Sequence, residues 1–248
     1  MYKILFIGIG KMGFPMAGFL SEKYEVSVYN RSKEKISIWK KKYGGNAVEN
    51  LNQLDEKFDF IISCIGNDDD LREITSNDTG CFNAIRKNTI FIDHSTVSPK
   101  IVQELELKLK EKEAFFLDAP ISGGQLGAEK GQLSIMVGGD KNAFNKSESI
   151  FEVYGKKRKY MGSSGSGQLT KIINQICIAG LVQGLSESIY FMKQTKLNPE
   201  DVLDVISSGA AQSWQMDNRF MTMTENKFDF GFAVDLMRKD LSIAFDEA

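Results

Sequence analysis

Lys171 and Asn174 are the residues most capable of chemistry, at the start of a segment whose helical apolar period continues to about Lys196. Residues three apart on a helix share a face, so the lysine ammonium and the asparagine amide project to the same side. Two interpretations fit this pair: a solvated stripe on the helix surface, or the floor of an active site. The pair alone does not choose between them.

A second candidate site follows a strand predicted at residues 114–117. Ser122, Gly123 and Gly124 offer a hydroxyl and exposed backbone N–H groups in one concavity, which can hold an anion without a charged side chain. A small carboxylate would suit such a site. The same residues also fit a glycine-rich turn, because residues 132–137 have the character of a following strand.

A dinucleotide-binding motif lies near the start of the chain, between a buried strand predicted at residues 2–9 and a strand at 25–29. In this context Gly8 permits a tight turn, Gly10 lets a pyrophosphate approach the backbone, and Gly13 lets the helix pack on the sheet. The N–H groups at the start of that helix then bind the phosphates. The predicted cofactor-binding residues here are Gly8, Ile9, Gly10, Lys11, Met12 and Gly13.

The residues that end the second strand indicate which dinucleotide binds. A carboxylate there would accept a ribose 2′-hydroxyl and favour NAD. The sequence has Asn30, Arg31 and Ser32 instead, with a guanidinium suited to a 2′-phosphate. We therefore predict NADP as the preferred cofactor and NAD as the second one. The alternative is that Arg31 caps a loop and either cofactor binds.

Two other polar features have simpler structural explanations. His94 is the single histidine, and after a strand it is more often a local hydrogen-bonding group than a proton shuttle, although Asp93 could orient it. Residues 68–70 are three successive aspartates, which suit the positive end of a helix better than a Mg²⁺ site. We predict no bound metal.

The elements that must position these residues alternate between strand and helix. This alternation predicts a doubly wound sheet with ligands at the carboxyl ends of its strands, where Thr96 lies. Beyond residues 2–29, strands are expected at 46–48, 58–65, 89–93, 114–117, 132–137 and 157–161, and helices at 33–43, around Leu51 and Leu54, and at 99–112 and 141–154.

The composition changes at residues 162–167, which are all glycine or serine and have the chemistry of a linker beside a cleft. Everything after them has helical character, including a helix that Asn198 caps and Pro199 begins. Met216, Met221 and Met223 are expected in a core or a subunit contact. We predict an N-terminal Rossmann domain at 1–162, followed by a long helix and an all-helical domain at 163–248.

The bulk composition is that of a soluble globular protein, with 42% hydrophobic and 26% charged residues in 248. A net charge of −2 gives no support for nucleic-acid binding. No unbroken apolar run approaches the ~20 residues of a membrane span. Three widely spaced cysteines indicate a reducing compartment. We expect a cytoplasmic protein that binds neither nucleic acid nor membrane.

Taken in order, the motifs resemble those of the β-hydroxyacid dehydrogenases, the 3-hydroxyisobutyrate dehydrogenase group. The similarity covers the whole chain. It rests on the glycine motif extended to Ala17, on Asp93 to Pro99, on Asp118 to Gly131, on Gly165 to Asn174, and on Lys239-Asp240-Leu241.

The resemblance implies an NAD(P)-dependent oxidoreductase with a role for each motif. Lys171 would be the general acid/base, with its pKa lowered by burial or a nearby cation, and Asn174 would hydrogen-bond the reacting oxygen. Ser122, Gly123 and Gly124 would hold the substrate carboxylate. Thr96 and Lys239 would contact the nicotinamide end of the cofactor. The helical domain would form a homodimer or homotetramer.

The leading hypothesis is therefore an NADP-preferring enzyme that interconverts a small β-hydroxyacid and its semialdehyde or keto form, of the 3-hydroxyisobutyrate and methylmalonate semialdehyde type. The alternatives are a glyoxylate or succinate semialdehyde reductase of the same family, or a non-catalytic dinucleotide-binding assembly module. The sequence stops at Ala248 inside a predicted helix, whereas the family continues. We therefore expect further helical sequence beyond that residue.

Overall fold

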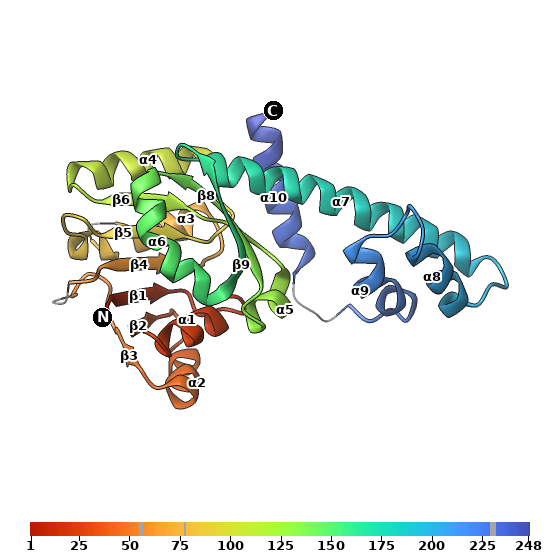
Figure 1. Cartoon of the computed structure of the whole chain (residues 1–248), viewed down its shortest axis with the longest axis horizontal. Coiled ribbons are helices and arrows are strands. Elements are labelled where there is room, and N and C mark those ends of the chain that lie inside the picture. The colour runs from red at the N-terminus through yellow and green to blue at the C-terminus, as the bar shows by residue number, and fades with distance from the viewer. Residues whose placement is uncertain (55–56, 77, 229–231) are drawn as a thin grey trace. The chain divides into compact units, whose positions relative to one another are not determined.

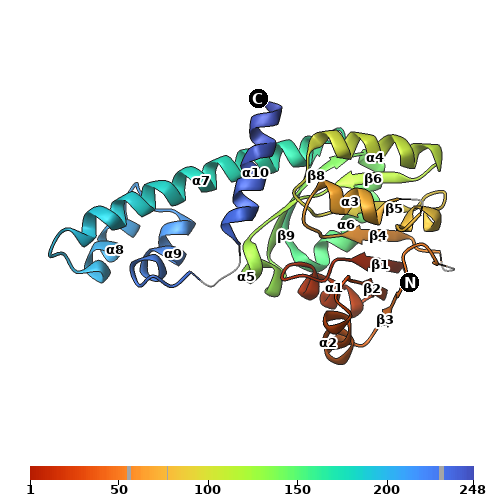
Figure 2. The same ribbon diagram turned by 180° about the vertical axis from the view of Figure 1, so that it is seen from behind.

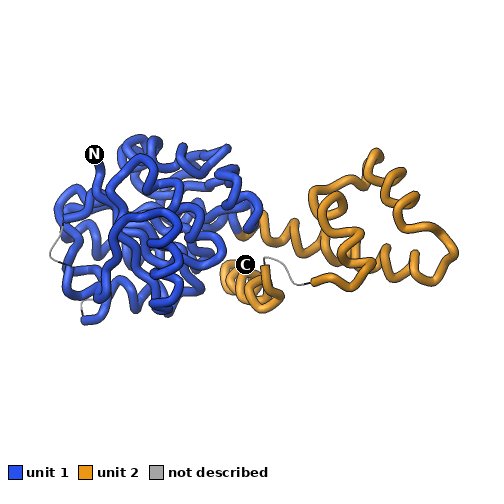
Figure 3. The backbone as a smooth tube through the Cα atoms, turned by 90° about the horizontal axis from the view of Figure 1, so that it is seen from below, with its two compact units in different colours: residues 1–171 blue, residues 172–248 orange. Residues whose placement is uncertain are grey.

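The computed structural model describes residues 1–54, 57–76, 78–228 and 232–248. These residues form two compact units, Met1–Lys171 and Ile172–Ala248, shown in two colours in Figure 3. Within the described residues the first unit contains two hydrophobic cores and the second contains one, and each unit is described by itself.

The first unit is built on one sheet of nine strands within the described residues (Figure 1). Its order is β3-β2-β1-β4-β5-β6-β8-β7, with β9 paired to β8. The strands from β3 to β6 are parallel, whereas β8 runs antiparallel to β6 and β7. The bounds are β1 Lys3–Ile7, β2 Glu25–Tyr29, β3 Asn46–Ala47, β4 Phe60–Ser63, β5 Ile90–Asp93, β6 Phe115–Asp118, β7 Ile121–Ser122, β8 Leu133–Gly139 and β9 Gly155–Gly162.

Helices cover both faces of this sheet, as the alternation of strand and helix predicts. Alternate side chains of β1 enter different cores: Ile4 and Phe6 belong to one, Leu5 and Ile7 to the other. Figure 1 shows α6 in front of the sheet, and Figure 2, from behind, shows α3 there. The bounds are α1 Gly13–Ser21, α2 Lys33–Tyr43, α3 Asp68–Ile74, the 3₁₀ turn η1 Cys81–Ala84, α4 Pro99–Glu111, α5 Gly124–Glu129 and α6 Lys141–Tyr154.

Local sequence signals explain where several helices begin. The Ser98 hydroxyl accepts a hydrogen bond from the N–H of Ile101, and Pro99 begins α4, as predicted. Asn67 caps α3 in the same way through the N–H of Asp70. The acidic run at residues 68–70 therefore forms the first turn of α3, at its positive end.

One local prediction was wrong, and one of the two alternatives for residues 122–124 differs from the structure. The helix expected around Leu51 and Leu54 is absent: the described residues 48–54 form a turn, in which the Asn50 amide donates to the Gln53 side chain. Between β7 and β8 the structure has the short helix α5 rather than a simple glycine-rich turn. Gly124 and Gly127 lower the helix propensity of that segment, which is why its sequence does not predict a helix.

The second unit is helical throughout its described residues. Helix α7, Ser166–Lys193, begins in the first unit and continues into the second, followed by α8 Pro199–Ser207, α9 Trp214–Thr224 and α10 Val234–Glu247. The Asn198 side chain caps α8 as predicted. The core joins Leu185, Ile189 and Met192 of α7 to Met216 and Phe220 of α9. Met221 and Met223 pack against it, so the methionines lie in or beside a core.

Helix α7 is long and apolar although it contains no unbroken apolar run of ~20 residues. By length and composition alone this helix of 28 residues, which contains an 18-residue stretch with a mean hydropathy of 1.2, would suffice to cross a membrane. Core helices of soluble proteins satisfy the same criterion, so this is weak evidence for a span.

Candidate active site

The glycine motif has the geometry that a bound dinucleotide requires. Gly8 has a φ of 93°, and a Cβ there would lie 2.4 Å from the carbonyl oxygen of Cys64. A Cβ at Gly13 would lie 2.1 Å from the carbonyl oxygen of Gly8, so glycine is needed where α1 packs against the loop. A Cβ at Gly10 would meet nothing within 4 Å. The backbone at Gly10 is therefore open to a pyrophosphate, and these residues fit the cofactor.

Asn30 braces this loop from the end of β2. Its Oδ1 accepts a hydrogen bond of 3.2 Å from the N–H of Ile9, and its Nδ2 donates to the carbonyl oxygen of Ser32. Asn30 thus links two segments predicted to bind the cofactor. Lys11 and Ser32 are exposed beside it, and Met12 is half-buried against the core.

Arg31 extends from the same loop and forms an ion pair. Its Nη2 lies 3.0 Å from Oδ1 of Asp70, and its side chain remains 71% exposed. Arg31 therefore has a local carboxylate partner, which its position in the sequence does not predict.

The loop after β5, which carries Thr96, is fixed by a buried hydrogen-bond network. Oδ1 of Asp93 accepts from the hydroxyls of Ser63 and Ser95, at 2.7 and 2.6 Å. The Ser95 hydroxyl in turn accepts from the N–H of Ile65, 2.9 Å away. Thr96 itself is half-buried at the carboxyl end of the sheet, where the family resemblance implies that the nicotinamide binds.

The start of α7 is held by Asp118, at the end of β6. The two carboxylate oxygens of Asp118 accept from the N–H groups of Gly165 and Gln168, both at 2.9 Å. A Cβ at Gly167 would lie 2.6 Å from the carbonyl oxygen of Asp118, so glycine permits this close approach. Burial raises the pKa of the Asp118 carboxyl from 3.8 to about 7, although the two N–H donors oppose that rise.

The Gln168 side chain adds a second attachment on the neighbouring loop. Its Nε2 donates to the carbonyl oxygen of Ser95 at 2.8 Å, and its Oε1 accepts from the N–H of Val97 at 3.2 Å. The glycine–serine stretch at 162–167 is therefore held on the first unit and is not the linker that its composition predicts. The compact units divide after Lys171 instead.

Lys171 lies one turn beyond Gln168 and is buried, with 7% of its surface exposed. The first interpretation of this residue, as part of a solvated stripe on the helix surface, does not fit a side chain that is so deeply buried. Hydrogen bonds attach the start of α7 to Asp118, at the end of β6, and to the loop after β5. These attachments fix the position of Lys171.

Ser122 ends β7, Gly123 caps the start of α5 and Gly124 is the first residue of α5. Ser122 pairs with Ser134 of β8 and is half-buried, whereas both glycines are exposed. A Cβ at Gly124 would meet nothing within 4 Å. The backbone at Gly124 is therefore accessible to a ligand.

His94 has a structural role. Its Nδ1 lies 2.6 Å from the carbonyl oxygen of Ala119, so this nitrogen carries the proton, and Nε2 accepts from the Tyr154 hydroxyl at 2.9 Å. Burial lowers the pKa of His94 to about 4, although the hydrogen bond to Ala119 opposes this. The imidazole is neutral and both nitrogens are occupied, as expected of a local hydrogen-bonding group.

The second unit contains Asn174 and Lys239, joined by two residues that the sequence analysis did not assign. Nδ2 of Asn174 donates to Oε1 of Gln175 at 2.8 Å, and Nε2 of Gln175 donates to Oδ2 of Asp240 at 2.6 Å. Lys239 lies 3.0 Å from the other oxygen of Asp240. A buried carboxylate thus connects α7 to α10. The sequence signal for this contact was Asp240 itself, because an acidic residue at a position of the helix that faces apolar neighbours needs a polar partner.

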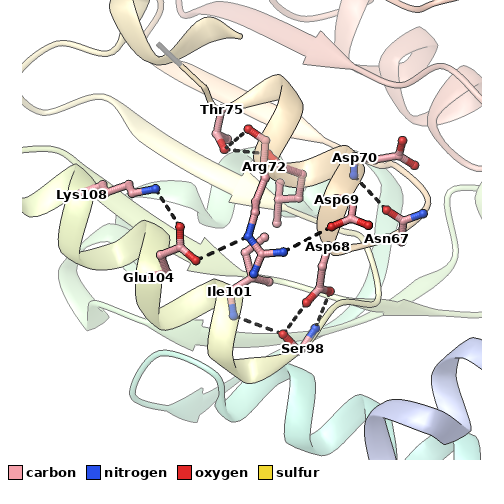
Figure 4. Close-up of polar contacts among 11 residues, drawn as sticks. Asn67, Asp68, Asp69, Asp70, Arg72, Thr75, Ser98, Ile101, Glu104 and Lys108 are labelled. Atoms are coloured by element: carbon pink, nitrogen blue, oxygen red, sulfur yellow. Dashed lines mark hydrogen bonds and ion pairs between the residues drawn. The ribbon is translucent and has the colours of Figure 1, made fainter. Parts of the chain in front are cut away.

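No cluster of histidine, cysteine or acidic residues suited to a metal occurs among the residues described. In the acidic run, Asp68 accepts from the N–H and the hydroxyl of Ser98, and Asp69 pairs with Arg72 (Figure 4). Helix capping and ion pairing thus explain these two carboxylates.

Comparison with known proteins identifies the family. Residues 3–162 match the family described as the NAD binding domain of 6-phosphogluconate dehydrogenase, and residues 165–248 match the NAD-binding domain of NADP-dependent 3-hydroxyisobutyrate dehydrogenase. The chain belongs to the β-hydroxyacid dehydrogenase family. As a member it is an NAD(P)-dependent oxidoreductase acting on a CH–OH group, similar to 3-hydroxyisobutyrate dehydrogenase.

Several relatives share the full span of this β-hydroxyacid dehydrogenase chain. An oxidoreductase of Shewanella frigidimarina is 46% identical over 100% of the chain and 86% of its own length. The 2-hydroxy-3-oxopropionate reductase of Escherichia coli is 32% identical over 99% and 84%. Among solved structures, 3-hydroxyisobutyrate dehydrogenase of Mycobacterium tuberculosis with L-serine has a TM-score of 0.86 and 27% identity, covering 100% of this chain and 86% of that one.

Proposed function

We propose that this β-hydroxyacid dehydrogenase is an NADP-preferring enzyme that interconverts a small β-hydroxyacid and its semialdehyde, of the 3-hydroxyisobutyrate and methylmalonate semialdehyde type. The observation that carries the proposal is the burial of Lys171 on a helix whose start is hydrogen-bonded to Asp118, at the carboxyl end of β6. A buried ammonium beside the ligand-binding edge of a parallel sheet is suited to proton transfer.

The protein has to manage one proton, because the nicotinamide supplies or accepts the hydride. In the reductive direction Lys171 donates its proton to the carbonyl oxygen of the semialdehyde. In the oxidative direction it accepts the proton of the hydroxyl group. Asn174 hydrogen-bonds the same oxygen, and its amide is oriented by Gln175.

Substrate binding rests on the segment from Ser122 to Gly124. Its backbone N–H groups and the Ser122 hydroxyl bind the substrate carboxylate, which explains the need for exposed glycines there. The Escherichia coli relative is named for a three-carbon semialdehyde, which supports a substrate with a carboxylate next to a short carbon chain.

Cofactor preference rests on Arg31, whose guanidinium suits a 2′-phosphate. The side chain extends into solvent at the end of β2, as an adenosine-binding residue of this fold should. Lys239 and Thr96 contact the nicotinamide end in this proposal.

The proposed assembly is a cytoplasmic homodimer or homotetramer formed through the helical unit. Four large apolar side chains of α7 are more than half exposed: Ile173, Ile176, Tyr190 and Phe191, at 64, 53, 67 and 71%. Such a series on one helix is typical of a subunit contact. Light scattering on the purified chain would measure the oligomeric state.

A substrate panel tests the proposed function. The protein is mixed with NADPH or NADH and with methylmalonate, tartronate or succinate semialdehyde or glyoxylate, and absorbance at the reduced-nicotinamide band is followed. We expect turnover with a semialdehyde and a lower KM for NADPH than for NADH. Absence of turnover with every member, by protein that binds NADPH, would contradict it.

A further inference from the structure

The ion pair between Arg31 and Asp70 joins the segments that follow two strands, β2 and β4, which lie on either side of β1. Arg31 follows β2, and Asp70 lies in the first turn of α3, which follows β4. Both β2 and β4 pair with β1 in parallel register. The contact of 3.0 Å therefore passes over the carboxyl end of β1, where the glycine motif begins.

The two partners differ in how firmly they are held. The Asp70 side chain is 18% exposed, and its backbone N–H donates to Oδ1 of Asn67 at 2.8 Å. A Cβ at Gly66 would lie 2.6 Å from Oδ2 of Asp70, so the carboxyl packs over that glycine. Arg31, with a side chain 71% exposed, is the partner that can move. Asp70 is thus a fixed anion and Arg31 a guanidinium able to change partners.

Asp70 is also distinct within its own acidic run. Figure 4 shows Asp68 directed toward Ser98 and Asp69 toward Arg72, whereas the carboxyl group of Asp70 points away from both. The other two aspartates therefore act within the network between α3 and α4. Asp70 alone among them pairs with a residue predicted to bind the cofactor.

We propose that Asp70 is a specificity-determining residue for the cofactor, because it competes with the 2′-phosphate of NADP for the guanidinium of Arg31. This inference rests on the proposed role of Arg31 in binding NADP. A 2′-phosphate must take over the guanidinium and lie near a fixed carboxylate of the same sign. NAD carries an uncharged 2′-hydroxyl, which meets no such repulsion. Asp70 therefore lowers the preference for NADP and keeps NAD usable.

The size of the effect follows from the exposure of the pair. A solvent-screened charge interaction changes an equilibrium by a few-fold rather than by orders of magnitude, so we expect about a three- to tenfold change in cofactor preference. The change should shrink as salt is added, because the Debye length falls to ~3 Å at 1 M ionic strength.

The test compares Asp70→Asn, Arg31→Ala and the double variant with the wild-type enzyme. Asp69→Asn is the matched control, because that side chain is 96% exposed and pairs with Arg72 instead. Two quantities are measured: kcat/KM for NADPH and for NADH with one semialdehyde, and the Kd of each cofactor by nucleotide fluorescence without substrate. Asp70→Ser provides a second replacement at the same position.

Asp70→Asn and Asp70→Ser should raise the NADPH-to-NADH ratio about three- to tenfold, mainly through a lower Kd for NADPH. Asp69→Asn should leave the ratio within about twofold. In the Arg31→Ala background, replacing Asp70 should have a clearly smaller effect, since there is no guanidinium to compete for.

Two results overturn the inference in distinguishable ways. If Arg31→Ala lowers the NADPH preference but replacement of Asp70 leaves it unchanged or lowers it, Asp70 is not a competitor and the proposed function stands. If Arg31→Ala leaves the preference unchanged, the assignment of Arg31 to NADP is wrong, and this inference falls with it.

Discussion

The backbone N–H of Gln168 donates a hydrogen bond of 2.9 Å to Oδ2 of Asp118, although 50 residues separate them in the sequence. With the matching bond from Gly165, it attaches the first turn of α7 to the end of β6. Since Lys171 follows one turn later, Asp118 is a positioning residue for the proposed general acid/base.

Replacing Asp118 by Asn should slow catalysis more than it weakens cofactor binding. The amide can accept one of the two hydrogen bonds but presents an NH₂ group to the other N–H, which shifts the start of α7. We expect kcat to fall about tenfold or more, because small displacements of a reacting group are costly. The Kd for NADPH should stay within about twofold. An unchanged kcat would show that the attachment does not position Lys171.

The same variant should reveal a pH-dependent contribution to stability. The folded pKa of Asp118, about 7, lies above the ordinary 3.8, so the folded state holds this proton more tightly than the unfolded state. The contribution is therefore fully favourable below pH ~4 and is lost as pH rises to ~7, by an amount on the order of 4 kcal/mol. Urea unfolding at pH 5 and pH 8 should show a larger loss of stability on raising the pH in the wild type than in Asp118→Asn. Parallel losses would contradict this.

His94 should show the opposite pH dependence. Its folded pKa of about 4 lies below the ordinary 6.5, so its contribution to stability is present above pH ~6.5 and is lost as pH falls toward 4. The loss is on the order of 3 kcal/mol. In His94→Gln the stability should fall less between pH 7 and pH 4.5, measured by urea unfolding. The variant should keep kcat within about threefold where it remains folded, since no proton transfer is assigned to His94; a loss of a hundredfold or more would make it a proton shuttle.

Gln175 should contribute to stability and activity through its hydrogen bond to the carboxylate of Asp240. In Gln175→Leu the buried Asp240 loses a charge-assisted hydrogen bond, and Asn174 loses its hydrogen bond to Gln175. We expect the free energy of unfolding to fall by about 1–3 kcal/mol and kcat/KM to fall about tenfold. Gln183→Leu is the matched control, because Gln183 lies on α7 with an exposed hydrogen bond to Glu187. Equal effects of both changes would remove the special role of Gln175.

The parts of the fold that could be predicted are those with a strong local signal. The predicted ranges 25–29, 33–43 and 141–154 coincide with β2, α2 and α6, because strand or helix periodicity there ends at clear breakers or caps. Ser98 and Asn198 mark α4 and α8 by the same physical chemistry.

The parts that could not be predicted depend on contacts between distant residues. The antiparallel direction of β8 follows from pairing of Asp118 with Gly138, which no local pattern encodes. The glycine and serine residues at 162–167 indicate a linker, whereas the attachment to Asp118 makes that stretch part of the first unit. Likewise, Arg31 is visible as a phosphate-binding candidate, but its pairing with Asp70 exists only in the folded chain.

The central claim is that Lys171 transfers the proton, and the most direct measurement is kcat of Lys171→Ala in NADPH-dependent semialdehyde reduction. Lys193→Ala, at the exposed end of the same helix, is the control. We predict that kcat of Lys171→Ala falls about 100- to 10,000-fold, while the Kd for NADPH stays within about twofold and Lys193→Ala behaves as the wild type. A kcat for Lys171→Ala within about tenfold of the wild-type value would contradict the account.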